Sequence, residues 1–260
     1  MKKLLIAVVV ISFCSCSCSY SSINTQKIEA SKNYVTRVVT TDHFKAIKLT
    51  GSPDVVYTQT DGRVHVEVYG SDNIVDLLDV YTENGSLNVR FKRNVQVYNK
   101  GKLEVRVFAP SLDRMEITGS GDITIASGLK TDGDLSISVT GSGDIDGSDI
   151  HCAQLSLSVT GSGDIELNRV AAGKTQAHVT GSGNINLSGT TQKADYSVSG
   201  SGDIDAARLK ADQVSANVTG SGDISCYAVS FLKARRAGSG DISYRGNPEI
   251  DAPNKGIHKL

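Results

Sequence analysis

The heptapeptide Val139-Thr140-Gly141-Ser142-Gly143-Asp144-Ile145 decides the fold, because its Gly-Ser-Gly-Asp/Asn-Ile core recurs through the second half of the chain. The core begins at Gly119, Gly141, Gly161, Gly181, Gly200, Gly220 and Gly238, at intervals of 22, 20, 20, 19, 20 and 18 residues. A near-constant period of about 20 residues is typical of a solenoid that makes one coil per repeat. The sequence therefore predicts seven stacked coils over residues 114–246.

Each repeat has the alternation of a β-strand. In Leu135-Ser136-Ile137-Ser138-Val139-Thr140, apolar side chains fall on one face and hydroxyl groups on the other. A glycine corner follows, where positive φ is accessible, and then a second short strand of the form Asp-Ile-x. Coils stacked about 4.8 Å apart would make a rod on the order of 34 Å long, with like residues in columns. We predict an all-β parallel β-helix, right-handed because crossovers between parallel strands favour that hand.

The interior of the rod is predicted to consist of two apolar columns. The first lies two residues before each corner and the second four residues after its first glycine. Their members are Ile117, Val139, Val159, Val179, Val198 and Val218 in the first, and Ile123, Ile145, Ile165, Ile185, Ile204, Ile224 and Ile242 in the second. Arg236 replaces the interior valine in the last repeat, which indicates that this coil lies exposed at one end.

Residues 35–113 lack the repeat and are predicted to be strands that cap or begin the solenoid. Asp61-Gly62 and Asn84-Gly85 are typical hairpin turns between alternating apolar runs. Thr50 to Val55 resembles a degenerate copy of the repeat, and residues 73–80 could hold one short helix. Residues 247–260 are expected to cover the open edge of the last coil, which would otherwise invite aggregation.

The N-terminus has the pattern of an export signal. Met1-Lys2-Lys3 precedes the apolar run from Leu4 to Phe13, which is too short to span a bilayer. Cys14-Ser15-Cys16-Ser17-Cys18 follows and resembles a bacterial lipobox, with Cys16 as the predicted lipid anchor and Cys18 as the alternative. A signal that is simply cleaved remains the other interpretation. We divide this part into a signal peptide, 1–18, and a flexible linker, 19–34.

The bulk composition agrees with a thin repeated core. The 260 residues are 39% hydrophobic but only 5% aromatic, with 26 glycines and no tryptophan. The formal charge of −1 predicts no nucleic-acid partner. Cys152 and Cys226 lie four repeats apart, roughly 19 Å at the β spacing, which is too far for a disulfide, so we expect two free thiols.

The position after each Gly-Ser-Gly is the most suggestive candidate site. Stacking would place its members in one column: Asp122, Asp144, Asp164, Asn184, Asp203, Asp223 and Asp241. Carboxylates about 4.8 Å apart repel one another, so cations or hydrogen-bond donors must offset the charge. Calcium is one possible occupant. Acceptance of backbone N–H groups at the corner is the other interpretation, and Asn184 favours it because an amide keeps the acceptor without the charge.

Catalysis has little support in the sequence. Asp144/Asp146, Asp164/Glu166 and Asp203/Asp205 form carboxylate pairs two residues apart on one outward face, which leaves open a β-helical enzyme acting on acidic polysaccharide. No coil is expected to carry a cleft-forming insertion or an aromatic platform. No nucleophile elbow, HExxH motif or phosphate loop is present. We therefore predict that the protein is not an enzyme and needs no cofactor.

The repeated Val/Ile-Thr/Ser-Gly-Ser-Gly-Asp/Asn-Ile motif behind a lipoprotein-like signal resembles the bacterial family called putative autotransporter adhesin, head GIN domain, over roughly residues 44–246. The resemblance implies a β-helical envelope protein with an adhesin role. Together these features predict an outer-membrane lipoprotein of a Gram-negative envelope, held by its lipid alone, on the periplasmic or the surface side. Its partner would be a glycan, the cell wall or a protein. The alternative to a binding role is a structural or regulatory spacer in the periplasm. The oligomeric state is left open.

Overall fold

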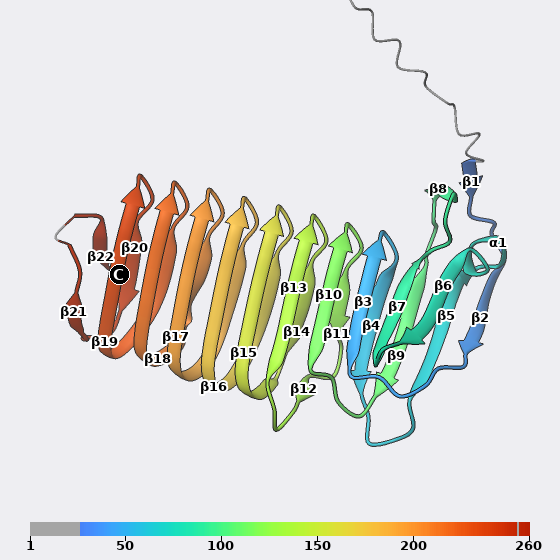
Figure 1. Ribbon diagram of the computed structural model, residues 1–260, viewed down its shortest axis with the longest axis horizontal. Helices are drawn as coiled ribbons and strands as arrows, with labels where there is room; N and C mark the ends of the chain where they lie inside the picture. The colour runs from blue at the N-terminus through green and yellow to red at the C-terminus, as the bar shows by residue number, and fades with distance from the viewer. Residues whose placement is uncertain (1–26, 254) are drawn as a thin grey trace, which may run out of the picture.

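The computed structural model describes residues 27–253 and 255–260. The signal segment, Cys16, Cys18 and the first part of the expected linker lie outside the described residues. The described chain is an elongated stack of β-coils with an antiparallel extension at its N-terminal end (Figure 1). The strand β1 (Lys27–Glu29) pairs in parallel with β8 (Gln96–Asn99). Part of the expected flexible linker is therefore a strand.

The repeats form a parallel β-solenoid, as predicted. Its strands are β10 (Arg114–Gly119), β11 (Ile123–Ile125), β12 (Leu129–Lys130), β13 (Leu135–Gly141), β14 (Ile145–Ser148), β15 (Ile150–Gly161), β16 (Ile165–Gly181), β17 (Ile185–Gly200), β18 (Ile204–Gly220), β19 (Ile224–Gly238) and β20 (Ile242–Arg245). The strands that end at the corners rise nearest the viewer and the chain returns behind them, while the coils advance from right to left (Figure 1). The coil is right-handed.

The second strand of the coil is longer than the sequence suggested. From β16 to β18 the chain stays in strand conformation from the isoleucine after one corner to the next corner, for 16 or 17 residues. The strand bends at small register shifts, such as the one between Leu167 and Val170. The expected Asp-Ile-x strand is thus only the first part of a continuous strand that wraps the lower edge.

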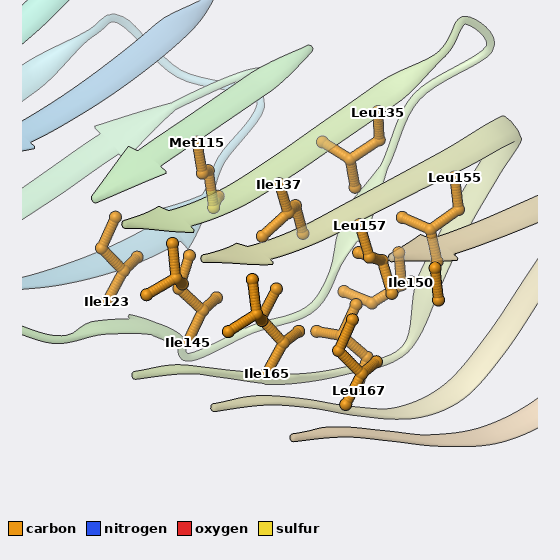
Figure 2. Packing of buried hydrophobic residues seen from close by; sticks show 14 of the residues in the cluster. Met115, Ile123, Leu135, Ile137, Ile145, Ile150, Leu155, Leu157, Ile165 and Leu167 are labelled. Atoms are coloured by element: carbon orange, nitrogen blue, oxygen red, sulfur yellow. The ribbon is translucent and has the colours of Figure 1, made fainter. Parts of the chain in front are cut away.

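The two predicted apolar columns form the core. Every member of both columns is at most 1% exposed. Figure 2 shows Ile123, Ile145 and Ile165 stacked from coil to coil, with Ile137 and Leu157 packed across from them. Burial of this apolar surface, at about 25 cal/mol per Å², is the main stabilising contribution to such a stack. Cys152 and Cys226 are buried and free, as predicted.

The two glycine positions of each Gly-Ser-Gly corner have no room for a side chain, because successive coils approach closely there. Gly141 has a φ of +126°, and a Cβ on Gly143 would meet the carbonyl oxygen of Gly121. The carbonyl of Gly119 accepts hydrogen bonds from the backbone N–H groups of Ser142 at 2.8 Å and Gly143 at 3.1 Å. The same pair of bonds joins each later corner to the one before it.

The N-terminal region begins the solenoid. β3 (Ala46–Gly51) pairs in parallel with β10, and β4 (Asp54–Gln59) pairs with β11, which aligns Gly51 with Gly119. The degenerate copy of the repeat is therefore a coil in its own right. β7 (Ser86–Phe91) extends the sheet beyond β3, and β9 (Glu104–Ala109) extends it beyond β4.

One of the two predicted hairpins is present. β6 (Leu78–Glu83) and β7 are antiparallel and joined by Asn84 and Gly85, both at positive φ. The prediction of a hairpin at Asp61-Gly62 is wrong, because β4 and the strand after this turn do not pair with each other. β9 lies between β4 and β5 (His65–Ser71), and β5 pairs with β9 and with β2 (Tyr34–Val39) instead.

The short helix and the C-terminal cover were predicted and are found. α1 (Asp72–Val75) is one turn long, and the described part of the chain holds no helix with the length and apolarity of a membrane span. β21 (Glu249–Asp251) pairs with β19 and β22 (Ile257–Lys259) with β20, covering the last coil. The expectation that the coil with Arg236 is exposed is wrong. The Arg236 side chain is only 15% exposed and lies against Gly256.

Candidate functional site

The corner column places its seven predicted members in successive coils, and every side chain except that of Asp241, the last, accepts a hydrogen bond from the next coil. Oδ1 of Asp122 accepts the backbone N–H of Asp144 at 3.0 Å, and Oδ1 of Asp144 accepts that of Asp164 at 2.8 Å. The same bond continues through Asn184, Asp203, Asp223 and Asp241. It begins at Asp54, a member that the sequence analysis missed. One oxygen of each carboxylate that has a following coil is thus committed to the fold.

A second acidic column lies beside the first. Asp146 pairs in register with Glu166, and Asn186 separates this pair from Asp205. Loss of hydration at the Asp146 carboxyl raises its pKa, and repulsion from Glu166 and Asp144 adds to the effect. Asn184 and Asn186 belong to one coil and divide both columns into two acidic groups.

The acidic columns do not have the ligand geometry of a metal site. Among residues 27–253 and 255–260, no group of three His, Cys, Asp or Glu side chains is arranged to hold a metal ion. The carboxylates repeat in register from coil to coil, and none of them lines the junction groove described next. A single free carboxylate oxygen per coil falls far short of the six to eight oxygens that calcium takes.

A groove forms where the N-terminal region meets the first full coils. Two adjoining cavities of about 990 and 490 Å³ share Lys45, Ser111, Asp113 and Arg114 in their walls. The larger one is bounded by the segment around β12, from Lys130 to Ser136, and by His151 and Ser156. We call these two cavities the junction groove. The expectation that no coil has a cleft-forming insertion is wrong.

Hydrogen bonds from Gln59 and from the backbone hold the walls of the junction groove. The side chain of Gln59 donates to the carbonyls of Pro110 at 2.7 Å and Lys130 at 2.8 Å, and accepts the N–H of Lys130 at 2.8 Å. The backbone N–H of Asp113 donates to the carbonyl of Lys45 at 2.8 Å, and Thr131 donates to His151 at 2.9 Å. The loop and β12 are therefore fixed to the first coils.

The junction groove carries free charges of both signs. In the described chain, the side chains of Lys45, Lys130, Asp113 and Asp132 have no ion pair or hydrogen bond within the protein, and all four are exposed. The guanidinium of Arg114 lies 3.7 Å from Glu116. Such a groove can bind a polar partner with charged groups of either sign.

Sequence reasoning missed this groove, although one signal was present. The interval between Gly119 and Gly141 is 22 residues, the longest of the series, and it contains Asp132-Gly133. The extra residues form the protruding segment after β12 (Figure 1). His151 also lines the groove.

These features define a β-solenoid protein with exposed surfaces suited to binding. The chain belongs to the family described as putative auto-transporter adhesin, head GIN domain, whose model matches residues 43–168 and 136–248. That description is of a binding protein of the bacterial envelope or surface and not of an enzyme. No curated protein matches the chain.

Solved structures share the fold over most of the chain. A putative lipid binding protein from Parabacteroides distasonis is 28% identical, with a TM-score of 0.84 over 90% of this chain and 100% of that one. A putative adhesin from Parabacteroides merdae is 26% identical, with a TM-score of 0.82 over 90% and 99%. A putative adhesin from Bacteroides fragilis is 30% identical, with a TM-score of 0.67 over 89% and 95%.

Proposed function

We propose that this protein is a non-catalytic, lipid-anchored binding protein of the Gram-negative outer membrane, and that the junction groove is its principal binding site. The observation that carries the proposal is the set of unpaired charges in the groove. Four exposed ionic side chains without a partner in the described chain, held on walls fixed by Gln59, form a preorganised polar site. The adhesin and lipid-binding descriptions of the solved relatives support a binding role.

The partner class is a glycan, the cell wall or a protein of the envelope. The test uses purified residues 19–260 against isolated peptidoglycan, lipopolysaccharide and detergent-solubilised outer-membrane proteins. We expect saturable binding to one fraction and at least a tenfold loss in the double variant Lys45→Gln/Lys130→Gln. Lys210→Gln, an exposed lysine on β18, is the matched control. Binding to none of the fractions, or equal binding by both variants, would contradict the proposal.

The anchor is proposed to be a diacylated Cys16, with Cys18 as the alternative. Mass spectrometry of the mature protein from the membrane fraction should show an N-terminal cysteine carrying lipid. Cys16→Ser should release the protein from the membrane, whereas Cys18→Ser should not. An unmodified N-terminus after a simple cleavage would contradict the lipoprotein assignment.

A further inference from the structure

A second groove lies in the C-terminal half of the solenoid. It is formed by the parts of β16 to β19 that lead up to the glycine corners. Lys174, Lys193, Gln213 and Phe231 occupy the same position in four successive coils, because the register pairs each with the next. They line a cavity of about 250 Å³ together with Ala194, Asp195, Val214, Ser215 and Lys233. We call this the lysine–phenylalanine groove.

Two lysines of this groove, Lys174 and Lys193, are stacked without an ion pair in the described chain, whereas the third, Lys233, pairs in register with Asp251 and interacts with its charge. Lys174 and Lys193 are paired in register, so their Cα atoms are about 4.8 Å apart. The exposed Asp195 is the acidic side chain among the lining residues. Two like charges at neighbouring positions favour an anion placed between them.

The other end of the groove is apolar and bounded by an acid. Phe231 is half-buried, and Ala194 and Val214 beneath the groove are almost fully buried. The column continues from Phe231 to Glu249 on β21. An elongated ligand would therefore have its negative group at the lysine end and an apolar face at the phenylalanine end, with the amide of Gln213 between them.

The cationic character is specific to these coils. The same column holds Asp134 and Gln154 in the two preceding coils, where Gln154 donates to Asp134 at 3.3 Å. A general need for solubility would not place two lysines and a phenylalanine in consecutive coils of one column. The change in residue type coincides with the cavity.

We propose that the lysine–phenylalanine groove binds an acidic saccharide. A carboxylate on one sugar lies between the ammonium groups of Lys174 and Lys193, and the apolar face of the adjoining ring lies on Phe231. Gln213 donates to a ring hydroxyl between the two. The inference rests on the proposed function, since it assumes an envelope binding protein, and it adds a ligand class and a second site separate from the junction groove.

Calorimetric titration with trigalacturonate, and with neutral galactotriose as the matched ligand, tests the proposal. We expect trigalacturonate to bind at least tenfold more tightly than galactotriose, with an affinity that falls as salt is raised. Lys174→Gln/Lys193→Gln should weaken trigalacturonate binding at least tenfold. Phe231→Leu keeps the apolar packing but removes the ring, and should weaken it about threefold. Thermal melts verify that each variant is folded.

Lys210→Gln, at an exposed lysine on β18 outside both grooves, is the matched control and should bind trigalacturonate like the wild type. Failure of trigalacturonate to bind, or undiminished binding in Lys174→Gln/Lys193→Gln, overturns the inference. Equally tight binding of polyglutamate shows a site for any polyanion and also overturns it. Loss of binding only in the junction-groove variant Lys45→Gln/Lys130→Gln overturns it too, but leaves the proposed function standing.

Discussion

Asn184 is the residue at which the corner column changes from a carboxylate to an amide. Its Nδ2 donates to Oδ1 of Asp164 at 3.0 Å, and its Oδ1 accepts the backbone N–H of Asp203 at 3.1 Å. An aspartate could accept the second bond but could not donate the first. The amide therefore joins the two acidic groups of the column while removing one charge from their middle.

Asn184→Asp is expected to destabilise the protein. The new carboxylate would face Asp164 and Asp203 in the adjacent coils, and two charges about 5 Å apart repel by roughly 1 kcal/mol in water. The free energy of unfolding should fall by about that amount at neutral pH and low salt. Urea denaturation at 20 mM and 500 mM NaCl checks this, since the loss should shrink at the higher salt concentration.

Asn217→Asp is the control for this substitution. Asn217 lies on the hydroxyl face between Ser197 and Arg235, where no carboxylate is paired with it. The same chemical change should leave stability within about 0.5 kcal/mol. If both variants lost the same stability, repulsion along the corner column would not be the cause.

At this scale the sequence predicts which residues are inside but not all of their partners. Period and alternation were enough to place Ile145 in a buried column and Asp144 at a corner. The hydrogen bond from Asp164 to Asp144 depends on the register between coils, which the repeat implies only if every coil has equal length. Asp54 was missed because Pro53 replaces the second glycine of its corner.

Among the elements, the last complete coil is closed by an arginine in an interior position. Arg236 pairs in register with Val218, and its Nη1 donates to the carbonyl of Gly240 at 2.6 Å and to Oδ1 of Asp241 at 3.2 Å. Gly256 of the tail lies directly against the guanidinium. The side chain thus ends the apolar column with a charge and joins the tail to the coil.

Arg236→Val is expected to promote association. A valine would continue the interior column but would lose the bonds to Gly240 and Asp241 and loosen the tail that covers the sheet edge. An uncovered parallel edge with an apolar end is a template for another chain. Light scattering between 5 and 200 µM should show a larger rise of mass with concentration than in the wild type. Arg236→Lys, which keeps the charge, should behave like the wild type; equal association by both variants would contradict this role.

The elements also show where local sequence signals fail. Asn84-Gly85 was predicted correctly because its two flanking strands pair with each other. Asp61-Gly62 has an equally good turn signal, yet β9 pairs with both flanking strands and separates them. β9 begins more than forty residues after that turn, so the competition is between distant segments and cannot be read from the local pattern.

For the whole molecule, the regular solenoid was predictable and the junction groove was not. The repeat gives each coil the same cross-section, so its columns follow from one copy. The groove depends on an irregularity: a loop at Pro110, the segment around Asp132 and the strand bearing His151 meet only after the N-terminal coil has stacked on the repeats. Departures from the period, rather than the period itself, mark the candidate sites.

The charge distribution of the whole molecule leads to a prediction about ions. The acidic columns extend along most of the solenoid, and dehydration together with Glu166 and Asp144 raises the pKa of Asp146. Because the folded-state pKa of Asp146 is raised, this group favours the folded state at low pH. Its contribution to the free energy of unfolding is lost as the pH rises through that pKa. Added NaCl should therefore raise the melting temperature more at pH 7 than at pH 4.

Calcium should affect stability only by screening the repulsion between the carboxylates of the acidic columns. Each corner carboxylate that is followed by another coil already uses Oδ1 to accept an N–H group, so the column offers too few oxygens at one point for a calcium ion. We expect equal melting temperatures in CaCl2 and MgCl2 at matched ionic strength, and no saturable heat on calorimetric titration with calcium. A rise of several degrees in calcium alone, reversed by chelator, would instead make the corner column a metal ladder. The bound ions would then offset the repulsion that Asn184 now relieves at one coil.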